Sequence, residues 1–532
     1  MSTAIKAGQM LCDSAAARGQ QRAQPDLPPT EQLLAEGGDA RIALDPESGA
    51  HKYGCRPYPD PDLAAFGSST ASVISAPGFV AAEQLRHRLL RAMGKEPQAV
   101  TYARELRRVR DELLRLCGVS DLAGLEVAFA ASGTDIHLFA SQLVGGSQSL
   151  PSLAVMIDAS ETGSCVPTAL AGRHFSSRAA LGDAVDEGVP IVDANAIEVV
   201  KVAMRRDDGT PRQAASIDAE VEALVAKAAA AGRRVLLTLV DVSKTGFIAP
   251  SPACVLELRQ RFPDTVDVLV DACQFRIAPS TLRVYLQQGF MVAVTGSKFV
   301  TGPSFSGALF FPLALARRFR AAALPRALRA YSVRADWPQT WAAADSLDDA
   351  PNFGLLLRWQ AALAELRAFR AVPEEDAADF LQNFARAIQD RLRSDPRFES
   401  LSTPQLDRRS LGAAQGWDDI QTIFPFVLYR AETRGRTPLS REQTMRVYRL
   451  LQTDLAEHPD FGRADSTGAA AALRCQLGQP VACGKRDGIP VSALRLCAST
   501  RLVVEATAWG GRRSSAVIER ALAALDKIAL LV

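Results

Sequence analysis

The sequence predicts an α/β fold with a mainly parallel sheet, and three observations point to it. Short apolar runs without alternation recur along much of the chain, as expected of strands that are buried on both faces. Helical or turn-rich segments separate most of these runs, which favours helices that cover both faces of the sheet. From Pro351 onward the pattern changes to long helices followed by isolated strand-like pieces, which predicts a smaller α+β C-terminal domain.

The predicted elements divide the chain into four regions. We expect a disordered N-terminus at residues 1–29, an N-terminal arm at 30–90, a large domain at 91–330 and a small C-terminal domain at 331–532. In the large domain, strands are predicted at residues 125–130, 153–157, 189–192, 235–240, 266–270, 291–294 and 307–311, and helices at 218–230 and 252–262. In the small domain, helices are predicted at 355–369, 374–393 and 515–531, and strands at 422–429 and 493–497.

Charge and composition argue against several classes of function. The formal net charge of the 532 residues is only +2, far from the basic balance that nucleic-acid binding usually needs. No apolar run approaches the ~18 residues of a membrane span, and the start lacks the apolar region of a signal peptide, so we expect a cytoplasmic protein without a membrane partner. The nine cysteines and five histidines form no metal-ligand spacing, so we expect reduced thiols and no metal site.

The most informative polar residues stand at the ends of two successive apolar strands. Asp271 follows the run at residues 266–270, and Lys298 follows the run at 291–294 in a Gly-Ser-Lys sequence. An Asp at such a position can keep a pyridine nitrogen protonated, and a Lys can carry pyridoxal phosphate as a Schiff base. Lys244 also follows an apolar run, but it ranks below Lys298 because only Lys298 comes after Asp271 in the chain.

A candidate phosphate-binding turn precedes both residues. Ser132, Gly133 and Thr134 stand where a strand turns into a helix. The free N–H groups of a helix start, together with two hydroxyl groups, can cradle a phosphate. The next residue, Asp135, would repel a phosphate, so we expect its carboxylate to cap the helix or to point away.

In this order the segments resemble the class V aminotransferase family of fold type I pyridoxal-phosphate enzymes, which includes cysteine desulfurases, kynureninase and serine–pyruvate-type aminotransferases. The likeness covers roughly residues 118–312 and, more faintly, 351 to the C-terminus. It implies the fold type I architecture, pyridoxal 5'-phosphate as the cofactor and a homodimer. It implies roles for Lys298 as the Schiff-base lysine, Asp271 at the ring nitrogen, Gln274 at the phenolic oxygen, Thr162 over the ring, Ser132, Gly133, Thr134 and Thr295 at the phosphate, and Arg495 at the substrate carboxylate.

The chain departs from the family pattern at several positions. Ser297 stands where many members have His, Ser243 where the family usually has Asn, and Ala350 in place of a Thr. Ser243 nevertheless remains a predicted cofactor contact. Ser69, in a polar segment of the arm, is expected to reach the substrate, and Arg501 is an alternative to Arg495.

The resemblance implies a pyridoxal-phosphate enzyme that acts at the α-carbon of a small amino acid or amine, with an aminotransferase as the leading hypothesis. The alternative enzyme is a C–S or other Cβ lyase, including a desulfurase, which would need a nucleophilic cysteine such as Cys475 or Cys483. A third hypothesis is a non-catalytic protein that keeps the fold for binding. The presence of both Asp271 and Lys298 argues against it.

Overall fold

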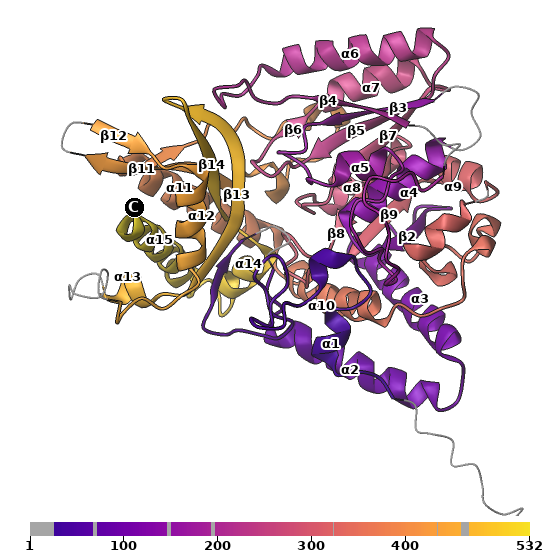
Figure 1. The fold of residues 1–532 in the computed structure, drawn as a ribbon, viewed down its shortest axis with the longest axis horizontal. Coiled ribbons are helices and arrows are strands. Elements are labelled where there is room, and N and C mark those ends of the chain that lie inside the picture. Colours follow the sequence, from indigo (N-terminus) through magenta and orange to yellow (C-terminus); the bar gives the residue numbers. More distant parts are fainter. Residues whose placement is uncertain are drawn as a thin grey trace, which may run out of the picture.

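The computed structural model describes residues 26–67, 72–145, 151–192, 197–322, 324–432, 435–458 and 468–532. They form a larger part around an eight-stranded sheet and a smaller part around a six-stranded sheet (Figure 1). Of the N-terminus predicted to be disordered, residues 1–25 lie outside the described ranges. Within those ranges, no helix has both the length and the apolar character needed to cross a bilayer.

The larger sheet is mainly parallel, which confirms the predicted fold class. Its strand order is β2-β9-β8-β7-β5-β3-β4, with β9 antiparallel to both neighbours and the short β6 antiparallel to β5. All residues of β3, β5, β7, β8 and β9 are buried, which explains their unbroken apolar sequences. The strands are β2 (Glu126–Ala130), β3 (Ser152–Ile157), β4 (Ile197–Val202), β5 (Val235–Asp241), β6 (Ile248–Ala249), β7 (Val266–Ala272), β8 (Met291–Thr295) and β9 (Gly307–Phe311).

Helices cover both faces of this sheet. In β2, Val127 and Phe129 belong to one apolar cluster, shared with α3, α6, α7, α8 and α10, whereas Ala128 and Ala130 belong to another, shared with α4, α5 and α9. Because alternate strand residues point to opposite faces, the two clusters are the two sides of the sheet. The helices are α2 (Ala76–Met93), α3 (Gln98–Leu116), α4 (Gly133–Gly145), α5 (Val166–Leu170), α6 (Ala214–Ala230), α7 (Pro252–Arg261), α8 (Pro279–Gln287), α9 (Leu313–Phe319) and α10 (Phe353–Arg370).

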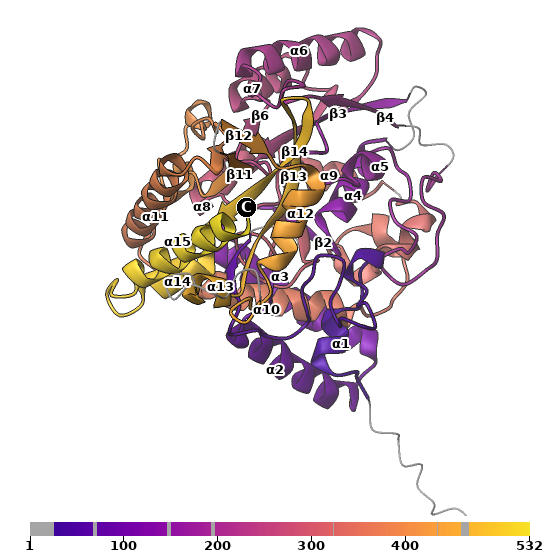
Figure 2. The same cartoon turned by 60° about the vertical axis from the view of Figure 1, so that its left-hand side comes forward.

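The smaller sheet has the order β1-β13-β14-β11-β10, with β12 paired to β11. Helices α11 and α15 lie on its outer side, away from the larger sheet, whereas α14 packs against α10 (Figures 1 and 2). Its strands are β1 (Ala64–Phe66), β10 (Phe398–Ser400), β11 (Ile423–Glu432), β12 (Gly435–Pro438), β13 (Cys475–Arg486) and β14 (Ile489–Cys497). Its helices are α11 (Glu374–Ser394), α12 (Arg441–Leu450), α13 (Gly468–Ala472), α14 (Thr500–Thr507) and α15 (Ser514–Leu531). Elsewhere in the chain, short 3₁₀ helices connect these elements and those of the larger part, and they span Arg326–Ala330, Arg334–Asp336, Ala342–Ser346, Arg409–Leu411 and Trp417–Asp419.

The N-terminal arm contacts both parts of the molecule. Helix α1 (Thr30–Leu34) and the following turn lie against α10, where the buried guanidinium of Arg358 donates to the carbonyl oxygens of Leu34 and Gly37 at 3.2 and 2.7 Å. A 3₁₀ turn (Ala40–Ile42) follows. Further along the arm, β1 pairs in parallel with β13 of the smaller sheet. The arm therefore bridges the two sheets.

One predicted strand, at residues 189–192, is wrong. This segment lies in a long connection in which Arg173 and Pro190 form only an isolated bridge. Pro190 has no N–H group, so it cannot extend a ladder of hydrogen bonds. The strand of this region is instead β4, whose four central residues are exposed or half-buried, as suits its position at the edge of the sheet. The other predicted strands and helices are found within a few residues of the expected positions.

Candidate active site

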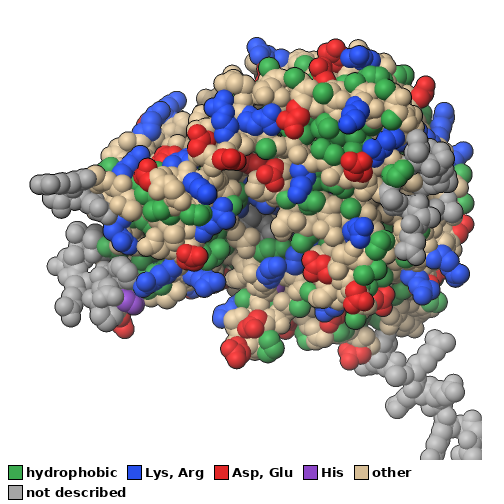
Figure 3. Space-filling view, turned by 45° about the horizontal axis from the view of Figure 1, so that its top comes forward, with side chains coloured by type: hydrophobic (Ala, Val, Ile, Leu, Met, Phe, Trp, Pro, Cys, Tyr) green, Lys and Arg blue, Asp and Glu red, His purple; other side chains and the backbone are tan. Residues whose placement is uncertain are grey.

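A cavity of about 390 Å³ lies where the two parts of the molecule meet. Its walls come from the carboxyl ends of the central strands of the larger sheet, the start of α4, the N-terminal arm, and β13 and β14. A hollow is visible between the two parts in Figure 3. Nine residues predicted from the sequence line the cavity, namely Ser132, Gly133, Thr134, Thr162, Asp271, Gln274, Thr295, Lys298 and Arg495.

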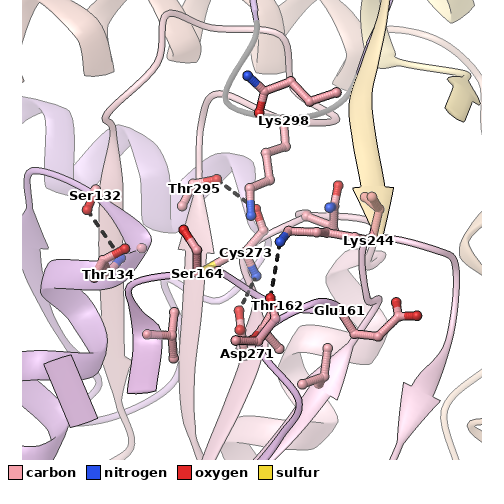
Figure 4. Close-up of a pocket in the computed structure, with 18 of the residues that line it drawn as sticks. Ser132, Thr134, Glu161, Thr162, Ser164, Lys244, Asp271, Cys273, Thr295 and Lys298 are labelled. Carbon is pink, nitrogen blue, oxygen red and sulfur yellow. Dashed lines mark hydrogen bonds between the residues drawn. The ribbon is translucent and has the colours of Figure 1, made fainter. Parts of the chain in front are cut away.

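Two lysines point into this cavity from opposite sides of β7 (Figure 4). Lys298 follows β8 and Lys244 follows β5, and these are the two neighbours of β7, which carries Asp271. The Nζ atom of Lys244 donates to the carbonyl oxygen of Ala159 at 3.2 Å. Among the residues that the structure describes, Lys298 Nζ has no hydrogen-bond acceptor. The amine of Lys298 is therefore available for chemistry.

Asp271 is buried and held in its ionised form. Its Oδ2 atom lies 3.4 Å from Nε2 of His137, and its Oδ1 atom accepts from the backbone N–H of Cys273 at 3.1 Å. Burial alone would raise the pKa of Asp271, but His137 and the ammonium of Lys298 outweigh it, and the pKa is well below its usual value. The site thus holds a fixed negative charge beside Lys298.

His137 was not singled out by the sequence analysis. It lies one turn into α4, where its Nδ1 atom is 2.7 Å from the carbonyl oxygen of Gly133. A carbonyl oxygen only accepts, so Nδ1 is placed to donate its proton to Gly133, and Nε2 faces the carboxylate of Asp271. The sequence signal that could have identified His137 is its spacing of four residues from Gly133, which puts both residues on one side of a helix.

The predicted phosphate-binding turn is built at the start of α4. Ser132 caps the helix, because its Oγ atom accepts from the backbone N–H groups of Thr134 and Asp135 at 3.2 and 3.3 Å. A Cβ atom on Gly133 would lie 2.9 Å from Sγ of Cys273, so only glycine fits there. The hydroxyl of Thr295 donates to the carbonyl oxygen of Cys273 at 2.6 Å, which ties the end of β8 to the segment after β7.

The carboxylate of Asp135 was expected to cap the helix or to point away, and the first expectation is wrong because Asp135 does not cap the helix. Its Oδ2 atom accepts from the Ser132 hydroxyl at 2.5 Å, so the carboxyl stays buried beside the turn. Burial and the nearby carboxylate of Asp39 raise the pKa of Asp135 to about 7, against the opposing effects of Ser132 and Arg41. The raised pKa favours the protonated carboxyl group, which weakens its repulsion of an anion at the turn.

Arg41 of the N-terminal arm also reaches the turn, and local sequence gave no sign of it. Its guanidinium donates to the hydroxyls of Thr134 and Ser132, both at 3.3 Å, and pairs with Asp39 at 2.6 Å. It lies 5.2 Å from the ring centroid of Phe305. The arm thus adds a cation to the turn that was predicted to bind phosphate.

Ser243 lies outside the cavity, although it was predicted as a cofactor contact. Its hydroxyl donates to Oε2 of Glu161 at 2.8 Å. The same carboxylate accepts from Thr245 Oγ1 at 2.7 Å and pairs with Arg205 at 2.9 Å. Because buried Glu161 needs such partners, it draws the Ser243 hydroxyl away from the cavity. Thr162, next to Glu161, does line the cavity.

Arg495 enters the cavity from β14, as predicted for a substrate-binding residue. It is 2% exposed, and its guanidinium donates to the carbonyl oxygens of Gln479 at 2.8 Å and Lys244 at 3.3 Å. A Cβ atom on Gly478 would lie 3.0 Å from its Cζ, so this glycine makes room for the side chain. The alternative, Arg501, pairs with Glu365 at 3.0 Å and does not line the cavity.

The remaining candidates do not reach the cavity within the described part of the chain. Ser69 lies outside the described residues. Cys475 and Cys483 are both buried on β13 and not on a loop. Burial raises the pKa of Cys475 to about 12 and that of Cys483 to about 11, which keeps both thiols protonated and poorly nucleophilic.

Comparison with known proteins adds a likeness of fold. No family model matches the chain, and no curated protein matches it. Among solved structures, it is similar to SPT with a pyridoxal phosphate internal aldimine (12% identity, 88% of each chain covered, TM-score 0.48), to the cysteine desulfurase CsdA from Escherichia coli (14%, 88% of this chain and 95% of that one, 0.48), and to a NifS-like protein (11%, 86% and 98%, 0.49). Identities at this level say nothing about the reaction, which has to be argued from the side chains in the cavity.

Proposed function

We propose that the protein is a pyridoxal-phosphate-dependent enzyme that acts at the α-carbon of a small amino acid, and that it transfers the amino group. The observation that carries the proposal is the convergence of Lys298 and ionised Asp271 in one cavity, from neighbouring strands. Pyridoxal phosphate, when bound, supplies an electron sink for the electrons that are left on the α-carbon. The residues of the cavity supply binding, orientation and proton transfer.

The donor set in the cavity fits this cofactor. The start of α4 offers the hydroxyls of Ser132 and Thr134 and the cation of Arg41 to a phosphate. Asp271 offers a carboxylate, held ionised by His137, to a pyridine nitrogen. Lys298 offers an unengaged amine between them. These are the three chemical features by which the cofactor would be held.

Lys298 also has the position of the acid–base group. Its amine and the guanidinium of Arg495 line the same cavity. Arg495 would bind the substrate carboxylate with its planar fork, and this contact would orient the bonds of the α-carbon. Lys298 would then take the proton from the α-carbon and return it during the transfer.

Transamination is preferred to the desulfurase alternative because, in the described part of the chain, neither of the predicted cysteines, Cys475 and Cys483, lines the cavity. Cys273, the one cysteine that lines the cavity, is buried beside Asp271, and both effects raise the pKa of its thiol.

We also propose that the enzyme is a homodimer, which the resemblance of the sequence supports. Sedimentation of the purified protein measures this directly.

A cofactor titration and an amino-donor screen test the proposal. Addition of pyridoxal phosphate to the purified protein should produce a visible absorption band that borohydride bleaches. Single amino acids, with a 2-oxo acid as acceptor, should then yield acceptor-dependent transfer of the amino group. Acceptor-free release of sulfide, ammonia or pyruvate would instead indicate a lyase, and the absence of any band would refute the proposed cofactor.

A further inference from the structure

Three cations in the cavity form no ion pair among the described residues, although Lys298 lies close enough to Asp271 to lower the pKa of its carboxyl group. The other charged lining groups are paired, since Arg41 pairs with Asp39 at 2.6 Å, Glu161 with Arg205 at 2.9 Å, and Asp271 with His137 at 3.4 Å. Within the described ranges, no ion pair involves Lys244, Lys298 or Arg495, all of which line the cavity. Arg495 is buried and the two lysines are half-buried, and cations withdrawn from water without a counterion are costly, so this arrangement points to anionic ligands.

The turn after β5 holds Lys244 next to Arg495. The backbone N–H of Lys244 donates to the carbonyl oxygen of Glu161 at 2.8 Å, and its own carbonyl oxygen accepts from Arg495 Nη1 at 3.3 Å. Its Nζ atom has a single acceptor, the carbonyl oxygen of Ala159 at 3.2 Å. An ammonium group carries three N–H donors, so Lys244 keeps donors for a ligand.

Glu161 is close in space but does not neutralise Lys244. Its carboxylate accepts from Arg205, Ser243 and Thr245, at distances between 2.6 and 2.9 Å. Arg205 already balances its single negative charge. The positive charges of Lys244 and Arg495 therefore remain side by side without an ion pair to either among the described residues, although the more distant carboxylate of Asp158 partly offsets that of Lys244.

From this arrangement we infer that the substrate is an amino acid with a second carboxylate in its side chain. This inference rests on the proposed function, in which Lys298 is engaged by the cofactor and the phosphate lies at the start of α4. Lys244 and Arg495 then remain for the substrate, and an α-carboxylate balances only one of them. Arg495 binds the α-carboxylate, and Lys244 binds the carboxylate of the side chain.

Unreactive acids test the inference without any turnover. Succinate and butyrate have four carbons each but differ by one carboxylate. Isothermal titration calorimetry on the cofactor-loaded protein should show that succinate binds at least tenfold more tightly than butyrate. In Lys244→Met this ratio should fall to near one with butyrate affinity unchanged, whereas Lys244→Arg, which keeps the charge, should retain the preference.

The outcomes separate this inference from the proposed function. Equal binding of the two acids by the wild-type protein, or an unchanged preference in Lys244→Met, would overturn the inference. A shifted absorption band in Lys244→Met with the preference intact would overturn it too, because Lys244 would then contact the cofactor. If pyridoxal phosphate produced no band, the proposed function would fail. Calorimetry on the same protein would still report whether Lys244 selects a second carboxylate.

Discussion

Two turns of the larger sheet have nearly the same sequence pattern and different surroundings. Each follows an apolar strand and carries a Ser-Lys pair, Ser243-Lys244 after β5 and Ser297-Lys298 after β8, on either side of β7. The first turn is tied down, since the carboxylate of Glu161 accepts from the Ser243 hydroxyl and Arg495 donates to the carbonyl oxygen of Lys244. The amine of Lys298 has no such tie among the described residues. The position after a central strand therefore places two lysines at the cavity, and the contacts of each lysine decide its role.

The aspartates of β5 and β7 also differ in their surroundings. Asp241 ends β5, but buried Arg408 donates to its Oδ2 atom at 2.8 Å and Tyr285 donates to the same atom at 2.7 Å. Asp271, near the end of β7, faces the cavity and is supported by His137. An acid that is saturated by protein donors stabilises the fold, whereas one that faces a cavity is available to a ligand.

Replacement of the two lysines gives the largest expected difference. Lys298→Ala should lose the absorption band of the cofactor and at least ~10⁴-fold in turnover, the upper end of what a positioned acid–base group contributes. Lys244→Ala should keep the band, because the amine that carries the cofactor remains. Spectroscopy and steady-state rates check both. The roles of the two turns would be exchanged if the borohydride-reducible adduct survived in Lys298→Ala and disappeared in Lys244→Ala.

Replacement of the two acids should separate chemistry from stability. Asp271→Asn should still bind the cofactor but lose on the order of 10²–10³ in turnover, the cost of removing one electrostatic stabiliser. Asp241→Asn should instead lower the free energy of unfolding by about 3 kcal/mol, because buried Arg408 loses its nearest counter-charge and keeps the carboxylate of Asp419 at 3.6 Å. Turnover numbers and denaturant titrations distinguish the two effects. Near-full activity of Asp271→Asn with saturating cofactor would show that Asp271 is an ordinary strand-end residue.

Arg495 should affect substrate binding and leave the cofactor unchanged. Arg495→Ala should raise KM roughly 10- to 100-fold, since hydrogen bonds to charged groups contribute ~1.5–3 kcal/mol. The cofactor band should not shift, because Arg495 contacts the Lys244 turn and not the turn of Ser132. Arg495→Lys is the matched control, which keeps the charge and loses the fork. A loss of cofactor affinity in Arg495→Ala would contradict the assignment.

The smallest expected effect is a dependence on pH that comes from Lys244. Burial, Arg495 and Lys298 lower the pKa of Lys244 to about 8, while Glu161 and Asp158 act in the opposite direction. Its positive charge is thus present below pH 8 and lost above it. The preference for succinate over butyrate should therefore decline as the pH rises through about 8. Lys244→Arg should keep the preference to higher pH, and the same decline in that variant would exclude Lys244 as its cause.

The parts of the site that could be predicted from sequence are local. Asp271, Lys298 and the turn of Ser132 each stand at the end of an apolar strand, and in parallel sheets such ends gather at one edge. Arg41 could not be predicted, because its contact with Ser132 joins residues 91 positions apart through the packing of the arm. The orientation of Ser243 was equally hidden, since it depends on Glu161, 82 residues away.

The pairing of β1 with β13 has a consequence for the order of folding. In the arm, Cys55 contacts Gln476, which lies 421 positions later in the chain. The arm therefore cannot fold into its final position until almost the entire chain has left the ribosome. Arg495 is also synthesised near the end. The larger sheet, complete by Phe311, can form long before its cavity has walls. A chain that stops before β13 would therefore have both Lys298 and Asp271 in a folded sheet and yet have no enclosed site.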